Sequence, residues 1–136
     1  MFRCFFSYVA AGLLCVLPPV VQAQYVGPVS VSRHFSANVL RGEIVFALPP
    51  EVQLNENHTR TAPGLRIRNA QNMLVMSQTL IGQKFLVHYA LEEATGLIKD
   101  IWILSPTEAA REPWPRTPTE ARNWQFDTTS QRWVRP

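Results

Sequence analysis

The sequence predicts a mainly β protein: a small antiparallel barrel or sandwich of about six strands, with two short C-terminal helices and a terminal hairpin. Apolar residues alternate with a period of two over much of the middle of the chain. Turn-forming residues interrupt this alternation at short intervals, and two helix-start signals follow in the last third. We therefore divide the chain into a leader at 1–23, a lead-in segment at 24–41, a β core at 42–104, and a tail at 105–136 that packs on the same domain.

The first 23 residues have the pattern of an export signal. Arg3 precedes a short apolar run, Pro18-Pro19 ends it, and Val21-Gln22-Ala23 suits a signal peptidase. The run is shorter than the ~20 residues of a membrane-spanning helix. We therefore expect cleavage near Ala23, no transmembrane segment afterwards, and a bacterial periplasmic or secreted location. Lipidation at Cys15 is the alternative, although the residue before Cys15 is not small.

The composition of the remaining chain restricts its chemistry. Both cysteines, Cys4 and Cys15, fall in the leader, so we expect neither a disulfide nor a cysteine metal site in the exported protein. The whole chain has 13 Lys and Arg against 10 Asp and Glu, and loss of Arg3 leaves a net charge of only +2. Such a weak field gives no reason to expect nucleic acid as a partner.

The alternation predicts the strands in order. The expected strands lie at 42–48, 51–54, 63–68, 73–76, 83–91 and 97–104, and the expected turns at 55–58, 69–72 and 92–96. The first strand ends at Pro49-Pro50 and is the candidate for an exposed edge that pairs with another protein. The last strand is apolar on both faces except at Lys99 and Asp100, which predicts a central strand with Trp102 in the core.

The strand at 83–91 has two distinct faces. Its expected inward side chains are Phe85, Val87, Tyr89 and Leu91. Lys84 and His88 belong to the opposite face, where we expect exposed, titratable side chains.

The tail begins with two nearly identical motifs. In each, a hydroxyl residue precedes proline and is followed three positions later by glutamate, at Ser105 to Glu108 and at Thr117 to Glu120. These are capping boxes, which predict two short helices. The final segment, 124–134, is expected to form a hairpin around 127–130 that pairs Trp124 with Trp133 and Phe126 with Gln131. Such a hairpin is too weak to stand alone, so the tail is expected to pack on the domain.

The sequence contains no recognisable catalytic or metal-binding pattern. After the leader it has no cysteine nucleophile, no Gly-x-Ser-x-Gly motif and no closely spaced histidine pair. We therefore expect no catalytic residues, no metal site and no cofactor. The alternative is a small hydrolase or isomerase whose acid/base site lies near His88, Asp100 and Glu92.

Two groups of residues are candidates for binding. Arg66, Arg68, Lys84 and His88 occupy the polar sides of their strands and would form a cationic face for carboxylates or phosphates if those strands are neighbours. Trp114 and Arg116 belong to an aromatic and arginine cluster of a kind common at interfaces. The sequence thus favours an exported, non-catalytic module that binds an envelope protein or an anionic cell-wall component. No pattern indicates an oligomeric state.

Overall fold

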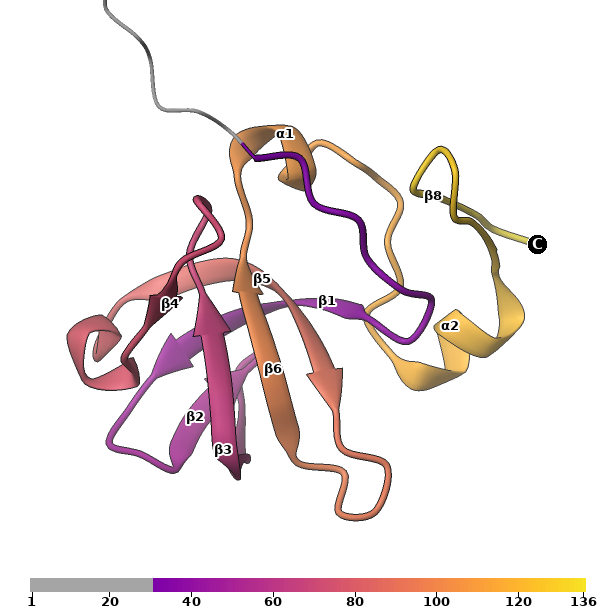
Figure 1. Ribbon diagram of the computed structural model, residues 1–136. Coiled ribbons are helices and arrows are strands. Elements are labelled where there is room, and N and C mark those ends of the chain that lie inside the picture. The colour runs from indigo at the N-terminus through magenta and orange to yellow at the C-terminus, as the bar shows by residue number, and fades with distance from the viewer. Residues whose placement is uncertain (1–30) are drawn as a thin grey trace, which may run out of the picture.

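The computed structural model describes residues 31–136, and their main feature is a closed β-barrel (Figure 1). The strands of the main sheet are β1 (Leu40–Phe46), β2 (Glu51–Leu54), β3 (Asn57–Arg68), β4 (Leu74–Val75), β5 (Lys84–Leu91) and β6 (Ile98–Ile103). Their order is β2-β1-β5-β6-β3-β4, and a further pairing of β2 with β3 closes five of them into a ring. The prediction of a small, mainly β barrel is confirmed.

The barrel has a specific connectivity. Its neighbours are antiparallel except for β3 and β6, which run parallel. When the five ring strands are numbered along the chain, they follow one another as 1-2-3-5-4 and return to 1. This is the strand order of the OB-type Greek-key barrel. Unrelated functions share such folds, so the connectivity by itself assigns none.

The first strand is not an edge. We predicted a free edge at 42–48, but β1 pairs with β2 on one side and with β5 on the other. Barrel closure uses both edges of β1, and this long-range pairing has no local sequence signal. Gly42 lies at a crowded point of the strand, where an added Cβ would meet Leu54 Cδ1 at 2.9 Å. The edge strand is instead β4, which pairs only with β3.

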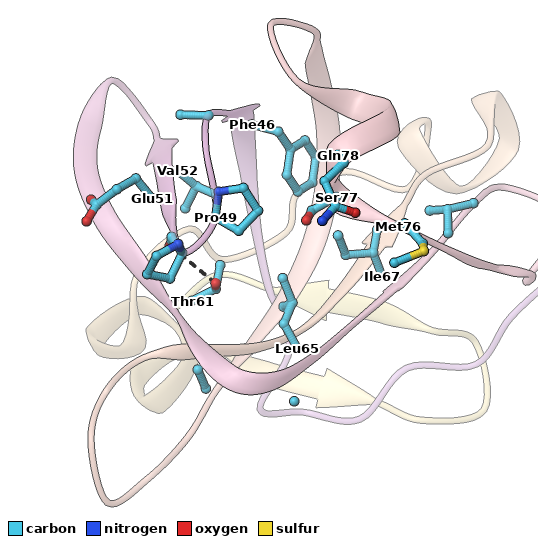
Figure 2. A pocket seen from close by; sticks show the side chains of 15 residues that line it. Phe46, Pro49, Glu51, Val52, Thr61, Leu65, Ile67, Met76, Ser77 and Gln78 are labelled. Atoms are coloured by element: carbon cyan, nitrogen blue, oxygen red, sulfur yellow. Dashed lines mark hydrogen bonds between the residues drawn. The ribbon is translucent and has the colours of Figure 1, made fainter.

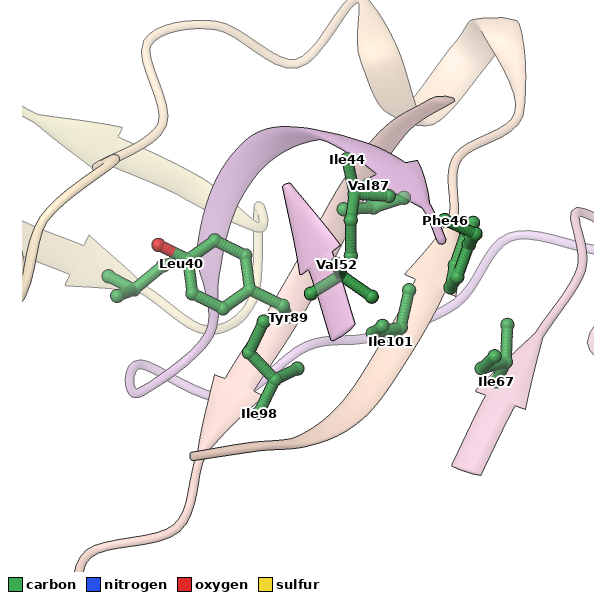
Figure 3. Packing of buried hydrophobic residues seen from close by; sticks show 9 residues of the cluster. All are labelled: Leu40, Ile44, Phe46, Val52, Ile67, Val87, Tyr89, Ile98 and Ile101. Carbon is green, nitrogen blue, oxygen red and sulfur yellow. The ribbon is translucent and has the colours of Figure 1, made fainter. Parts of the chain in front are cut away.

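The barrel interior is filled by alternate side chains from every ring strand (Figure 3). Val87 and Tyr89 are buried there, and Phe85 and Leu91 pack against them, as the alternation in β5 predicts. Burial of one such side chain stabilises the fold by about 1.5–3 kcal/mol. The residues of this inner cluster are Leu40, Ile44, Phe46, Val52, Ile67, Val87, Tyr89, Ile98 and Ile101.

The third strand is longer than predicted. The turn expected at 55–58 is confined to Asn55 and Glu56, both with positive φ (49° and 69°), and β3 begins at once with Asn57. The first residues of β3 are polar because they pair with β2 on an exposed part of the barrel. Gly64 lies inside β3 with φ 80°, where the register with β6 shifts.

A second layer covers part of the barrel's outer surface. It consists of residues 31–39 and the tail, which contains α1 (Pro106–Ala109), α2 (Pro118–Asn123), β7 (Gln125–Asp127) and β8 (Arg132–Val134). Figure 1 shows these segments together on one side of the barrel, although they come from opposite ends of the described chain. They enclose an outer cluster of buried side chains, Phe35, Val39, Trp114 and Trp133.

The outer cluster also accounts for two tryptophan predictions. Trp114, a candidate for binding, is buried within the molecule. Trp102 was expected in the core, but it is only half-buried and packs against the outer cluster instead of the barrel interior. The alternation along β6 places Ile101 inside the barrel and Trp102 outside.

Both predicted capping boxes are present. The Ser105 and Thr117 hydroxyls accept hydrogen bonds from the backbone N–H groups of Glu108 and Glu120, and the two carboxylates accept from the cap residues in return. The predicted terminal hairpin is confirmed, but its register is wrong by two residues.

The hairpin pairs Phe126 with Trp133 and Gln125 with Val134. Asp127 explains the difference, because its carboxylate accepts hydrogen bonds from the N–H groups of Thr129 and Ser130. These bonds place the loop after Asp127, so the midpoint of the hairpin lies one position later in the chain than symmetry about 127–130 requires. Each residue of β7 therefore pairs with a partner two positions further along than predicted.

The predicted leader at 1–23, Cys15 and the first part of the lead-in segment lie outside the described residues. Within 31–136, no helix has the length and apolar character needed to cross a membrane.

Candidate binding surfaces

The structure does not form the predicted cationic face. Lys84 lies 2.9 Å from the Glu43 carboxylate, and Arg66 lies 2.8 Å from that of Asp100. Strand β6 separates the strands that carry Lys84 and Arg66. Arg68 lies apart from both, where it lines a cavity beside the lead-in segment. Paired and dispersed in this way, these cations do not make one surface.

His88, the fourth member of that predicted face, is fully buried. Its side chain points outward from the barrel, as predicted, but the second layer covers it. The ring stacks on Trp114 at 4.2 Å between centroids and meets the edge of Phe35 at 4.4 Å. Burial, reinforced by the charge of Arg41, lowers the pKa of His88 to about 2. The ring is therefore neutral, and the expectation of an exposed titratable histidine is wrong.

A buried ion pair lies beside His88 and joins the lead-in segment to α1. Arg33 Nη2 is 2.6 Å from Glu108 Oε2, and both side chains are almost completely buried. Arg33 also donates to the carbonyls of Asn69 and Ile103. Burial raises the pKa of the Glu108 carboxyl, but hydrogen bonds from Arg33 and from the Ser105 backbone outweigh it and leave that pKa lowered.

Arg41 is the second buried arginine, and it has no carboxylate partner. Its side chain is 2% exposed. It donates to Nε2 of His88 from two of its nitrogens, and to the carbonyls of Glu108 and Ala109 at the end of α1. Burial lowers the pKa of Arg41, yet a guanidinium stays charged in proteins. No Asp or Glu among the described residues forms an ion pair with it.

Arg41 forms part of the wall of a cavity of about 410 Å³, which we call the arginine cavity. Its lining residues are Arg41, Glu112, Pro113, Trp114, Arg116 and Arg135. Two members of the predicted aromatic and arginine cluster, Trp114 and Arg116, therefore do meet at one site. Arg116 and Arg135 are exposed, and neither forms an ion pair within the described part of the chain.

A second candidate surface is apolar and lies at the β4 end of the barrel. Most of the exposed large apolar side chains of the described residues belong to its segments: the β1–β2 loop, β4 and the residues on both sides of it, and the residue after the short 3₁₀ helix η1 (Ser77–Leu80). We call this the apolar face, and its members are Leu48, Met73, Leu74, Met76 and Ile81. Leu48 and Leu74 are 74% and 67% exposed. The chain carries no charged residue from 69 to 83.

A groove of about 350 Å³ lies next to these segments, and Met76 of the apolar face lines it (Figure 2). Side chains from β1, β2, β3, β4 and η1 surround it, and Glu51 is its only charged lining residue. The apolar lining includes Phe46, Val52, Leu65, Ile67, Val75 and Met76. The groove therefore continues the uncharged character of the surface beside it.

The alternative acid/base site does not assemble around one cavity. His88 and Asp100 are buried, and Asp100 is paired with Arg66. Glu92 lines a separate cavity of about 650 Å³ that contains neither of them. Among residues 31–136, no group of three or more His, Cys, Asp or Glu is arranged to hold a metal ion.

Sequence reasoning missed three features of these surfaces. Arg41 and Arg135 were not among the predicted site residues, because nothing local shows that the tail returns to the start of β1. The apolar face has a signal in the sequence, the uncharged run at 69–83, but the alternation there predicts only a turn at 69–72 and a strand at 73–76.

Comparison with known proteins gives no match: no family model, no curated protein and no solved structure matches this chain.

Proposed function

We propose that this protein is an exported, non-catalytic module that binds another protein through its apolar face. The observation that carries this proposal is an apolar groove together with five exposed large apolar side chains on the segments around it, four of them on the uncharged run 69–83. Soluble monomers rarely expose large apolar patches unless these contact a partner. The methionines Met73 and Met76 suit such a role because their flexible side chains adapt to a bound surface.

The occupant that fits best is an extended, uncharged apolar segment of the partner. Strand β4 uses one edge to pair with β3, so its other edge is available to a further strand. Val75 lines the groove, whereas its neighbour Leu74 is exposed. A strand added to β4 would likewise send alternate side chains toward the groove. A charged partner segment would lose hydration here, and Glu51, the one charged lining residue, is already paired with Arg60.

The test is crosslinking in cells that express the tagged, full-length gene product. A photoreactive residue at Gln78, beside the groove, should capture one partner in nearly equal amount. Leu74→Lys should reduce this capture at least several-fold, because a lysine on an edge strand opposes strand addition. Val134→Lys is the matched control, since Val134 is also an exposed apolar residue of a short strand but lies in the terminal hairpin.

Equal capture by wild type and Leu74→Lys would refute the assignment of the apolar face, as would the absence of any specific partner.

Export is a separate part of the proposal, and it is supported by the leader pattern at 1–23. Intact-mass measurement of the protein from the cell envelope should give a chain that begins at Gln24. A mass that includes the leader would contradict cleavage.

A further inference from the structure

We propose that the arginine cavity is a second binding site, which takes a small organic dianion whose charge lies on phosphate or carboxylate oxygens. Its charge, its buried arginine and its size each support this assignment. The site is separate from the apolar face, because it is built from the start of β1, the segment between α1 and α2, and the end of the chain. It therefore does not depend on the proposed function.

The buried arginine is the strongest observation. A guanidinium has five N–H groups, and Arg41 uses its Nε–H, both of its Nη2–H groups and one Nη1–H in bonds to His88, Glu108 and Ala109. One N–H on Nη1 has no partner among the described residues, and Arg41 forms part of the cavity wall. All of its partners are neutral groups. The Glu112 carboxylate favours the charge on Arg41 without forming an ion pair with it. A bound anion would supply the close counter-charge that a buried guanidinium needs.

The other charges around the cavity reinforce this requirement. The nearby carboxylate of Glu108 is already paired with Arg33. The lining contains three arginines and one glutamate, Glu112, which is a formal net charge of +2. Guanidinium groups present paired donors that match carboxylate and phosphate oxygens. The cavity therefore fits a dianion that presents phosphate or carboxylate oxygens to the arginines.

The size of the cavity indicates that the ligand has an organic part. A volume of about 410 Å³ lies within the range of small-molecule sites, roughly 300–1,000 Å³, and exceeds the space that one inorganic anion fills. Pro113 and Trp114 supply apolar wall beside the arginines. A phosphate monoester and a dicarboxylate share this chemistry, and the experiment separates them.

The test is titration calorimetry at low ionic strength with two probes, glycerol 2-phosphate and succinate, added to the leaderless protein. At least one probe should bind, with an affinity that falls as sodium chloride is added. Tighter binding of glycerol 2-phosphate would assign a phosphate monoester as the ligand class, and tighter binding of succinate a dicarboxylate.

Substitution then locates the site. The double variant Arg116→Gln with Arg135→Gln should weaken binding about tenfold or more, because two charge-assisted contacts are lost. Both side chains are exposed, so the fold should be unaffected. Arg132→Gln, at another exposed arginine of the tail, is the matched control and should bind as wild type does. The proposal is overturned if neither probe binds, or if the double variant binds as tightly as Arg132→Gln.

Discussion

His88 shows that alternation along a strand predicts the direction of a side chain but not its burial. The period of two in β5 correctly predicts that this side chain points out of the barrel. It does not show that residues more than twenty positions away will cover it. The ring is stacked on Trp114, and Arg41 donates to its Nε2, which fixes the proton on Nδ1. The prediction of an exposed histidine failed because burial depends on chain packing and not on local pattern.

The low pKa of His88 makes stability depend on pH. In the folded protein the ring stays neutral down to about pH 2, whereas in the unfolded chain it takes up a proton near pH 6.5. Between these values the unfolded state binds more protons, so the free energy of unfolding falls as the pH falls. Denaturant titrations should show a loss of about 2 kcal/mol from pH 7 to pH 5 that is smaller in His88→Gln. The same slope in both proteins would contradict a neutral buried histidine.

The elements of the second layer are short and depend on specific side-chain contacts. Helix α1 has only four residues. Its start is capped by Ser105, its Glu108 is paired with Arg33, and its last carbonyls accept hydrogen bonds from Arg41. Helix α2 has the same capping motif but lies at the surface. The same capping motif is therefore expected to contribute more to the free energy of unfolding in α1 than in α2.

Removal of the two cap hydroxyls should reveal this difference. Ser105→Ala should lower the free energy of unfolding by about 1–2 kcal/mol, because it leaves the buried N–H of Glu108 without a partner. Thr117→Ala should lower it by about 0.5–1 kcal/mol, since water can replace the hydroxyl there. Urea denaturation of both variants measures the two values. An equal or larger loss for Thr117→Ala would contradict the tighter coupling of α1.

Local patterns predicted the elements better than their pairing. The strands near 83–91 and 97–104, the turn at 92–96 and both capping boxes could be found from the sequence because each depends on neighbouring residues. The pairing of β1 with β5, the extension of β3 through polar residues and the hairpin register could not. The cationic face failed for the same reason, since the partners of Arg66 and Lys84 lie on other strands.

At the scale of the whole molecule, the fold is a barrel with a second layer held on its side. The inner cluster comes entirely from ring strands, whereas the outer cluster needs both the lead-in segment and the tail. Trp133 of the terminal hairpin packs 6.1 Å from Trp114 between ring centroids, and Phe126 packs 4.8 Å from Trp133. The last residues of the chain thus contribute to a core.

Deletion of residues 124–136 should therefore destabilise the molecule. The free energy of unfolding should fall by about 3–5 kcal/mol, the usual consequence of removing a buried tryptophan. Phe35 and Trp114 would lose their cover, so the truncated protein should also bind an apolar dye such as ANS. Thermal unfolding and dye fluorescence measure both effects. An unchanged melting temperature would show that the hairpin only rests on the surface.

The contacts between the lead-in segment and the tail also set the order in which parts of the molecule can fold. Arg33 meets Glu108 across 75 positions, and Phe35 meets Gln131 across 96. During synthesis from the N-terminus, the lead-in segment is made before these partners, and it can meet them only after Glu108 and Gln131 have been added. Contacts of such long separation form slowly. A growing chain therefore keeps Phe35 without its partner until the terminal hairpin has been made, so the outer cluster can close only as a late step of folding.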